Sequence, residues 1–453
     1  MESFKIKIVE PIQILAKKER LRILKKAGYN LFRVPADKVT IDFLTDSGTG
    51  ALSQDQLAMM MKGDESYAGA KSWQRFEKAA QEFTGKKEII PVHQGRAAEK
   101  IITETLVNPH TFKGVGVKSR GCYAVANTFF DTTRANFEHT GAVCVDFPAS
   151  DNIASREKFK GNLNVRAADY FLKKNGAKTA ALVMTATNNA NGGQPVSLAN
   201  ISAAAALARR YKIPFIIDAC RVAENGYFIK RDEKSASAMT ISAIVRKSLK
   251  NADIVFMSAK KDGLANMGGF IATDNKKFAE MFKNLGILYE GYSTYGGMSG
   301  REMETVAQGL KEVLEENYLR HRVGQVAELH KTLSKIGFKL INPPGGHAVY
   351  LDASTALPHV KKENLPGQAL AISFYLEGGV RGVEIGTLMF GKSARRELVR
   401  LALPRRAYTK SHLDYVAEVG KAVWKKRKTL RGFKIVKAPA ELRHFSATFR
   451  PVS

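Results

Sequence analysis

Short apolar runs alternate with helix-like segments over the first two thirds of the chain. The runs predict strands at residues 88–92, 123–126, 142–146, 179–185, 214–218, 254–258 and 269–273. Several of the strands are separated by stretches of helical length, such as residues 201–211. Nearly continuous apolar strands that alternate with helices are typical of a mainly parallel sheet covered on both faces. We therefore expect an α/β fold, with ligands bound at the carboxyl ends of the strands.

The two ends of the chain show a different pattern. Residues 12–27 predict a short helix within an N-terminal arm, residues 1–45. Further along, a long predicted helix at 303–333 leads through the turn PPGG to a strand at 348–352. The chain is also longer than one small core supports. We expect a large domain over 46–310 and a smaller α+β domain over 311–453, to which the arm contributes.

The composition narrows the class of protein. Hydrophobic residues make up 44% of the chain, and no uninterrupted apolar run is long enough to span a bilayer. The first twenty residues lack the apolar core of a secretory signal. The three cysteines, Cys122, Cys144 and Cys220, show no metal-ligand spacing and suit a reducing compartment. We expect a cytoplasmic protein without a membrane span.

The charge balance is strongly basic. Lys and Arg number 71 against 43 Asp and Glu, a formal net charge of +28. Such an excess suits either a solvated basic surface or nucleic-acid binding. The basic residues are spread along the chain, with no zinc-finger spacing and no long basic tail. The spread favours a solvated surface, and we expect no nucleic-acid partner.

Polar side chains follow three of the predicted strands. The run PFIIDACR ends in Asp218, with Arg221 shortly after it, and DIVFMSAKKDG ends in Ser258, Lys260 and Lys261. A third strand leads into the loop NNANGGQP. Each pattern has a structural explanation: Asp218 and Arg221 can pair with each other, and the lysines can lie in a solvated turn. The loop alone is an ordinary Asn- and Gly-rich connection.

Taken together, these strand ends suit pyridoxal phosphate (PLP). That cofactor needs a lysine for its Schiff base and a carboxylate that keeps the pyridine nitrogen protonated. Lys261 and Asp218 fit these two tasks. Its phosphate needs cationic and N–H donors, best supplied at a helix N-terminus, as in the segment HQGRAAEK at 93–100. Phe129 or Phe130 offers an aromatic ring to stack on the cofactor.

Ordered motifs along almost the whole chain resemble the β-eliminating lyase family, which contains the tryptophanases and the tyrosine phenol-lyases. The motifs are LTDSGTGA (44–51), GDESYAG (63–69), PVHQGRAAE (91–99), FFDTT (129–133), NGGQPVSLAN (191–200), IDACRVAENGYFIK (217–230), MSAKKDGLANMGGF (257–270), TYGGMSGREME (294–304), PGGHAVYLDA (344–353), VEIG (383–386), LPRRAYT (403–409) and LRHFSA (442–447). The resemblance implies a fold-type I PLP enzyme of the transferase-like class.

The resemblance also implies a role for each matching position in the cofactor site. Lys261 matches the Schiff-base lysine, Asp218 the partner of the pyridine nitrogen and Phe130 the stacking ring. Asn189 and Arg221 match the residues that contact the phenolic oxygen of the cofactor. The positions that match the phosphate site are Gln94, Gly95, Arg96, Ser258 and Lys260.

Further positions match substrate, subunit and cation contacts. Arg405 matches the arginine that binds the substrate carboxylate, with Thr45 and Ser47 beside it. Tyr67 and Tyr295 match residues that one subunit supplies to its neighbour, Tyr67 as a proton donor, within a homotetramer. A monovalent cation, K⁺ or NH₄⁺, is implied by Glu65, Asn266 and the backbone of Gly48.

Three positions bear on the leaving group. Ile385 stands in VEIG where phenol-lyases carry an arginine for the phenol hydroxyl, and Asp131 and His444 match the tryptophanase pattern. An apolar Ile385 would leave a buried phenol hydroxyl without a partner, a loss of roughly 1–3 kcal/mol. Against this, Arg301 and Arg406 look more like the phenol-lyase pattern, and the loop between Ile385 and Arg405 is short.

We therefore expect PLP-dependent β-elimination of L-tryptophan to indole, pyruvate and ammonium. Tyr67, Asp131 and His444 are the candidates for proton transfer to the leaving group. The alternatives are a tyrosine phenol-lyase and a lyase for another β-substituted amino acid, such as an S-alkyl cysteine. A non-catalytic scaffold would show damage at Lys261, Asp218 or Arg405, and all three are intact.

Overall fold

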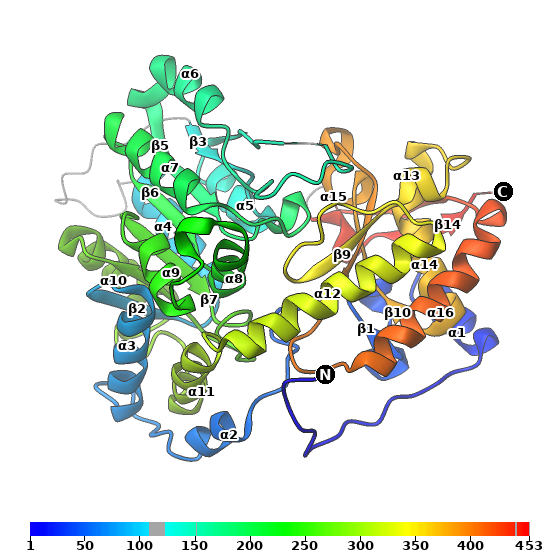
Figure 1. Cartoon of the computed structure of the whole chain (residues 1–453), viewed down its shortest axis with the longest axis horizontal. Coiled ribbons are helices and arrows are strands. Elements are labelled where there is room, and N and C mark those ends of the chain that lie inside the picture. The colour runs from blue at the N-terminus through cyan, green and yellow to red at the C-terminus, as the bar shows by residue number, and fades with distance from the viewer. Residues whose placement is uncertain (108–122, 151, 440–441, 453) are drawn as a thin grey trace. The chain divides into compact units, whose positions relative to one another are not determined.

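The computed structural model describes residues 1–107, 123–150, 152–439 and 442–452 (Figure 1). Contacts divide the chain into two compact units. Unit 1 comprises residues 1–46, 153–156 and 321–453, and unit 2 comprises residues 47–152 and 157–320. Towards the C-terminus, the boundary between the units lies between residues 320 and 321, within the helix Glu316–Ile336, and not after residue 310 as expected. The reason is that Tyr318 and Leu319 are buried in the core of unit 2.

A seven-stranded sheet forms the centre of unit 2, in the order β2-β8-β7-β6-β5-β3-β4. Its strands are β2 (Glu88–Val92), β3 (Tyr123–Ala126), β4 (Val143–Asp146), β5 (Thr179–Thr185), β6 (Phe215–Asp218), β7 (Ile254–Ser258) and β8 (Gly269–Thr273). From β7 through β4 neighbouring strands are parallel, whereas β8 is antiparallel to both β7 and β2. The predicted mainly parallel sheet is confirmed, with one reversed strand.

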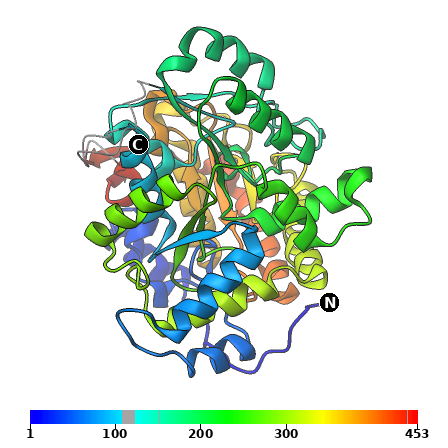
Figure 2. The ribbon, with the colours of Figure 1, turned by 90° about the vertical axis from the view of Figure 1, so that its left-hand side faces the viewer.

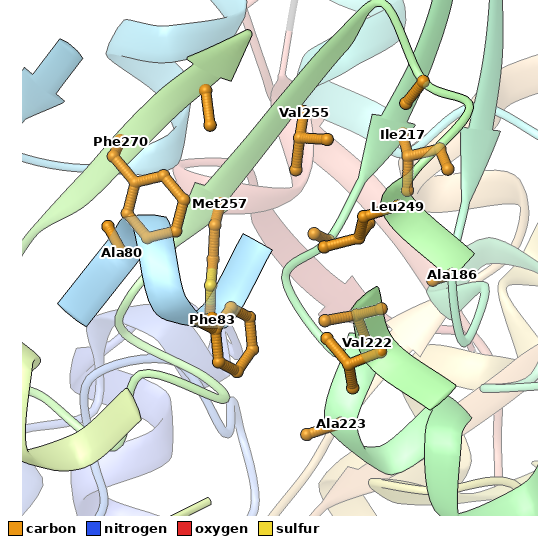
Figure 3. Close-up of a cluster of buried hydrophobic side chains, with 14 of the residues drawn as sticks. Ala80, Phe83, Ala186, Ile217, Val222, Ala223, Leu249, Val255, Met257 and Phe270 are labelled. Carbon is orange, nitrogen blue, oxygen red and sulfur yellow. The ribbon is translucent and has the colours of Figure 1, made fainter. Parts of the chain in front are cut away.

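Both faces of this sheet are buried, which explains the almost uninterrupted apolar strands. Alternate residues of one strand enter different cores: Ile217 packs in one cluster and Ile216 in the other. In Figure 3, Val255 and Met257 of β7 lie in the first cluster with Phe83 and Val222 from the covering helices. Burying the apolar side chains on each face supplies the main driving force for this fold.

Ten helices of unit 2 surround or flank the sheet within the described residues. They are α2 (Gln54–Met60), α3 (Lys71–Thr84), α4 (Gly95–Val107), α5 (Asp131–His139), α6 (Val165–Asn175), α7 (Leu198–Arg210), α8 (Val222–Asp232), α9 (Ile241–Leu249), α10 (Lys276–Tyr289) and α11 (Gly300–Glu312). Helices α3 and α11 pack against each other, as Figure 2 shows. Helices α4, α5 and α10 supply the core of one sheet face, and α3, α7, α8 and α9 that of the other.

The single helix expected at 303–333 is wrong. The structure has two helices there, α11 (Gly300–Glu312) and α12 (Glu316–Ile336), separated by a short turn. Helix α11 begins after a capping box formed by Ser299 and Glu302, and it ends at Glu312, with Val313 as its C-cap residue. The apolar spacing continues across the turn, so periodicity alone does not reveal a break this short.

Unit 1 is an α+β assembly around a three-stranded antiparallel sheet, in the order β11-β12-β9. Its strands are β1 (Ile41–Asp42), β9 (Ala348–Asp352), β10 (Val380–Arg381), β11 (Val383–Ile385), β12 (Leu398–Ala402), β13 (Phe433–Lys437) and β14 (Thr448–Pro451). Its helices besides α12 are α1 (Lys17–Lys26), α13 (Ala353–Ala356), α14 (Pro366–Gly378), α15 (Thr387–Phe390) and α16 (Lys410–Lys426). The N-terminal residues belong here because β1 pairs with β10.

The N-terminal helix is shorter than the predicted 12–27. Helix α1 begins only at Lys17. Ile12 and Ile14 are 42% and 77% exposed, whereas Leu24 is fully buried. The predicted helix included Ile12 and Ile14 because they are apolar, but in the described structure both side chains remain exposed.

Among the described residues, no helix combines the length and the apolar character needed to cross a bilayer. Two of the three cysteines, Cys144 and Cys220, are free thiols. The third, Cys122, lies outside the described residues.

Candidate functional site

The carboxyl ends of β5, β6 and β7 meet at one edge of the sheet. Thr185 at the end of β5 pairs with Asp218, and Asp218 pairs with Phe256 of β7. The loops that leave this edge carry the polar residues singled out from the sequence. Those that are buried are Asn189, Asp218, Arg221, Ser258 and Lys261. The parallel sheet thus gathers residues that are far apart in the sequence, as predicted.

Lys261 follows β7 and is only 9% exposed. Its Nζ lies 5.9 Å from the centre of the Phe130 ring. Phe130 is half-buried at the start of α5, whereas Phe129 is buried in the core against Phe137. Of the two aromatic candidates, Phe130 is therefore the one that the fold brings to the lysine.

Asp218 is held by the turn that follows its strand. Its Oδ1 accepts a hydrogen bond of 3.0 Å from the backbone N–H of Cys220. Cys220 Sγ in turn accepts one of 3.2 Å from the N–H of Ser258, so this thiol joins the ends of β6 and β7. Burial, reinforced by the Asp218 carboxylate, raises the pKa of Cys220 and keeps it a neutral thiol. Sequence reasoning assigned no role to Cys220, although its place two residues after Asp218 was a usable signal.

The positively charged side chains of Arg96, Lys260 and Lys261 form a cluster where α4 begins, which we call the cationic cradle. A Cβ atom on Gly95 would be 2.8 Å from Cβ of Ser258, so only a glycine lets α4 approach the end of β7 this closely. Gln94 and Arg96 flank this glycine. Burial lowers the pKa of Lys260, and the neighbouring charges of Lys261 and Arg96 add to the effect. The N-terminus of a helix beside clustered cations is a suitable environment for a phosphate.

Glu99 is a buried carboxyl group that sequence reasoning missed. It lies on α4, accepts a hydrogen bond of 2.8 Å from Thr133 Oγ1 and contacts Asn136 Nδ2 at 3.4 Å. Burial raises its pKa to about 7, and the charges of Asp218 and Asp131 act in the same direction. Glu99 therefore joins the helix of the cationic cradle to α5, which begins with Asp131.

Tyr67 and Tyr295 lie together, with ring centres 5.1 Å apart. The Tyr67 hydroxyl accepts a hydrogen bond of 3.1 Å from the N–H of Tyr292. Tyr67 is nevertheless 60% exposed. The fold thus presents this tyrosine at the surface of unit 2.

Two of the three residues expected to bind a cation lie together. Asn266 Nδ2 donates to the carbonyl oxygens of Gly48 at 3.1 Å and Gly50 at 3.3 Å. Glu65 lies elsewhere: it accepts a hydrogen bond of 3.1 Å from the Gly300 N–H and lies 3.7 Å from Arg301 Nε. Within the described ranges, no group of three His, Cys, Asp or Glu side chains is placed to hold a metal ion.

Unit 1 positions Arg405 by a buried ion pair. Arg405 is 2% exposed, and one of its terminal nitrogens donates to Asp46 Oδ2 at 2.9 Å and to the Asp46 carbonyl at 3.2 Å. Arg322 approaches the same carboxylate at 3.7 Å. Thr45 and Ser47, the other candidates for this group, flank Asp46 in the sequence and are half-buried. Asp46 fixes the guanidinium group and was not singled out from the sequence.

The structure places Ile385 and His444 in one neighbourhood of unit 1. Ile385 belongs to a small apolar cluster with Tyr350 and Leu398, and Phe32 packs against that cluster. The Phe32 ring lies edge-on to the His444 ring, with centres 5.8 Å apart. His444 is 3% exposed. Phe32, from the N-terminal segment, is the link that sequence reasoning missed, and its local sequence offered no signal.

Comparison with known protein families and curated sequences gives one consistent result. The family described as β-eliminating lyase matches residues 42–419. A tryptophanase from Salinibacter ruber is 45% identical and covers 100% of this chain and 95% of its own length. A tryptophanase from Hyphomonas neptunium is 46% identical, covering 99% and 98%. A tyrosine phenol-lyase from Nostoc punctiforme is 40% identical, covering 99% and 96%.

Solved structures resemble the fold at much lower sequence identity. A serine palmitoyltransferase from Sphingomonas wittichii has a TM-score of 0.63 at 14% identity, over 91% of this chain and 97% of its own. Another, from S. paucimobilis with a bound PLP–myriocin aldimine, has a TM-score of 0.60 at 14% identity, over 85% and 88%. These likenesses show the fold, which is the fold-type I architecture of PLP enzymes.

Proposed function

Because the chain belongs to the β-eliminating lyase family of PLP-dependent enzymes, we propose that it cleaves L-tryptophan to indole, pyruvate and ammonium. The relatives named tryptophanase are 45% and 46% identical to it, whereas the relative named tyrosine phenol-lyase is 40% identical. The proposal rests above all on the apolar surroundings of Ile385.

Ile385 favours an indole over a phenol leaving group. It is 5% exposed and lies in an apolar cluster, so it offers no hydrogen-bond partner to a phenol hydroxyl. Leaving that hydroxyl unpaired would cost about 1–3 kcal/mol. An indole ring has no such group on its carbocycle and gains from apolar contact. Phe32 and His444, which lie beside this cluster, complete the surroundings that we assign to the ring.

The residues present fit the cofactor. Asp218, anchored by the Cys220 N–H, supplies the carboxylate for the pyridine nitrogen, and Phe130 supplies a ring beside Lys261. Gln94, Gly95, Arg96, Ser258 and Lys260 supply the phosphate donors, and Asn189 and Arg221 the contacts for the phenolic oxygen. PLP, when bound, withdraws electrons from the Cα of the amino acid and makes its proton acidic.

The side chains of the protein then bind the substrate and transfer its protons. Arg405, whose guanidinium is held by Asp46, binds the substrate carboxylate, with Thr45 and Ser47 as further contacts. Lys261 Nζ removes the proton from Cα.

Departure of indole requires a proton at its C3 atom. We assign this transfer to Tyr67, Asp131 and His444, with Tyr67 as the donor. The bond between the substrate Cβ and indole C3 breaks, and the remaining three-carbon fragment takes up water to give pyruvate and ammonium. Atoms balance because one tryptophan and one water yield the three products.

The proposed assembly is a homotetramer whose active sites are shared between subunits. The exposure of Tyr67 supports it, as do the exposed apolar side chains at the end of α10 and just after it. These are Ile287, Leu288, Tyr289 and Tyr292, which are 44–68% exposed. Exposed apolar groups of this kind mark interaction surfaces. Tyr295 lies beside Tyr67 and would reach the cofactor of a neighbouring subunit.

Two further proposals complete the assignment. A monovalent cation, K⁺ or NH₄⁺, binds at a subunit interface, where Gly48 and Asn266 of one subunit meet Glu65 of its neighbour. The carbonyl oxygens of Gly48 and Gly50, already gathered by Asn266, support this choice. The free thiols of Cys144 and Cys220 support a reducing, cytoplasmic location.

Pyruvate release from three substrates tests the proposed function. We expect the purified holoenzyme to act faster on L-tryptophan than on L-tyrosine, and indole to appear in step with pyruvate. Faster release from tyrosine would make the protein a phenol-lyase. Release from S-ethyl-L-cysteine alone would make it a lyase for S-alkyl cysteines.

A further inference from the structure

Two glutamates hold the short helix α15 (Thr387–Phe390), which is separated from Ile385 only by Gly386. Glu384 Oε1 accepts from the N–H of Leu388 at 3.0 Å, and Oε2 accepts from the N–H of Met389 at 3.2 Å. Glu397 Oε1 accepts from the Thr387 N–H at 2.9 Å and from its hydroxyl. The first turn of α15 is therefore fixed by two carboxyl groups, one on β11 and one just before β12.

The two carboxyl groups approach each other around Gly386. A Cβ atom at Gly386 would lie 2.7 Å from Glu397 Oε2 and 2.8 Å from Glu384 Oε1. Both side chains are buried, at 2% and 3% exposure. Within the described chain, Glu397 Oε2 has no hydrogen-bond donor. Two buried carboxylates on either side of one residue repel each other, which disfavours the charged form of both.

The electrostatic surroundings favour the protonated form of these carboxyl groups. Burial raises the pKa of Glu384 to about 8, and the neighbouring Glu397 contributes. Burial also raises the pKa of Glu397, which the Lys362 ammonium only partly offsets. A pair in which one member is protonated holds the backbone N–H groups with only one buried charge instead of two.

Arg443 holds the same helix from the other side. Its guanidinium donates to the carbonyl oxygen of Leu388 at 2.6 Å and also to that of Thr387. Arg443 directly precedes His444, and Ile385 directly precedes Gly386. One short helix therefore lies between the two residues of unit 1 that we assign to the indole ring.

We propose that Glu384, Glu397 and Arg443 are positioning residues that set the leaving-group preference by fixing Ile385 and His444 relative to each other through α15. This inference rests on the proposed function of Ile385 and His444. None of the three need touch the substrate. We expect their effect on substrates with an aromatic leaving group, because an alkylthio group is too small to contact both Ile385 and His444.

The test compares two substrates in the same holoenzyme. L-Tryptophan needs the ring pocket, whereas S-ethyl-L-cysteine has a small leaving group that does not fill it. The ratio of their kcat/KM values is the selectivity, and it does not depend on how much enzyme is active. The variants are E397A, E397Q and R443M, with R450M, an exposed arginine on β14, as the matched control.

E397A and R443M should lower the selectivity about tenfold or more, with kcat/KM for S-ethyl-L-cysteine within about twofold of the parent. The visible absorbance of the bound cofactor should not change. E397Q should keep the parental selectivity, because its amide oxygen can accept from Thr387 and its uncharged amide does not repel Glu384. R450M should match the parent. Arg443 is only half-buried, so R443M should disturb folding less than E397A does. If E397A fails to fold, the selectivity of R443M tests the proposal.

A parallel fall for both substrates in R443M, or an unchanged selectivity, would overturn the proposal. So would an E397Q variant as unselective as E397A. The proposed function fails separately, when the parent enzyme itself prefers tyrosine to tryptophan. In that case the same three variants still report whether α15 controls the preference for an aryl over an alkylthio leaving group.

Discussion

Lys261 Nζ lies 5.9 Å from the centre of the Phe130 ring, although the two residues follow strands that are not neighbours. In the sheet order, β6 and β5 separate β7 from β3. Asp218 ends β6, and the loop after β5 carries Asn189. The residues that we propose to bind the cofactor therefore follow one another along the sheet edge in the order Lys261, Asp218, Asn189 and Phe130.

Removing the amine of Lys261 should abolish turnover. In Lys261→Ala we expect pyruvate release from tryptophan to fall by at least about a thousandfold, because the proposed base for the Cα proton is lost. The visible absorbance of the bound cofactor should disappear or shift. Lys277→Ala, an exposed lysine on α10, is the control and should behave as the parent does. Parental activity in Lys261→Ala would contradict the assignment.

Adding one methyl group at Gly95 should weaken cofactor binding. The new Cβ atom would meet Ser258 Cβ at 2.8 Å and push α4 away from β7. We expect the Kd for PLP, measured by titration of the apoenzyme, to rise by about tenfold or more in Gly95→Ala. Gly324→Ala is matched to it, since nothing lies within 4 Å of a Cβ atom there. Equal affinities in the two variants would show that the close approach of α4 is unimportant.

Placing an arginine at residue 385 should reverse the preference for the leaving group. Ile385→Arg puts a donor where a phenol hydroxyl would lie, so the ratio of kcat/KM for tyrosine to that for tryptophan should rise by about tenfold or more. Ile385→Val keeps the apolar character and should leave the ratio near that of the parent. A ratio that stays unchanged in Ile385→Arg would remove Ile385 from the pocket.

Glu99 should make stability depend on pH. Its pKa is raised from 4.5 to about 7, so the folded protein holds a proton that the unfolded chain loses from about pH 4.5 upward. The contribution of Glu99 to stability is therefore complete below its unfolded pKa and is lost as pH rises towards 7. Glu99→Gln lacks this titration, so its Tm relative to the parent should increase between pH 5 and 7. A constant difference in Tm would show that Glu99 does not hold the proton.

The strands, and the grouping of polar residues at their carboxyl ends, were predictable from the sequence. Apolar runs such as β7 lie between turn residues, and both faces of the sheet are covered, so the runs coincide closely with the strands. Parallel strands bring their carboxyl ends to one edge of a sheet. This rule alone groups Asp218 with Lys261, although 43 positions separate them in the sequence.

Relationships that depend on side-chain packing were not predictable. Phe129 and Phe130 are chemically alike, and only the fold decides that Phe129 is in the core while Phe130 lies beside Lys261. Phe32 reaches His444 from the opposite end of the chain. Glu99 looks like an ordinary helical glutamate until its burial and its contact with Thr133 are known.

The reversed strand β8 has a consequence for the lysine that precedes it. Ser258 at the end of β7 pairs with Gly269 at the start of β8, and the Ala259 N–H donates to the Gly268 carbonyl at 2.9 Å. These contacts join the two ends of the segment that carries Lys261. Within that segment, the carbonyl oxygen of Lys260 accepts a hydrogen bond of 2.7 Å from the Gly48 N–H. Because these hydrogen bonds hold the backbone beside Lys261, the amine that we propose as the base changes its position by side-chain rotation. Inserting one residue between Ser258 and Gly269 should disturb the placement of Lys261, whereas insertions in exposed loops elsewhere should not.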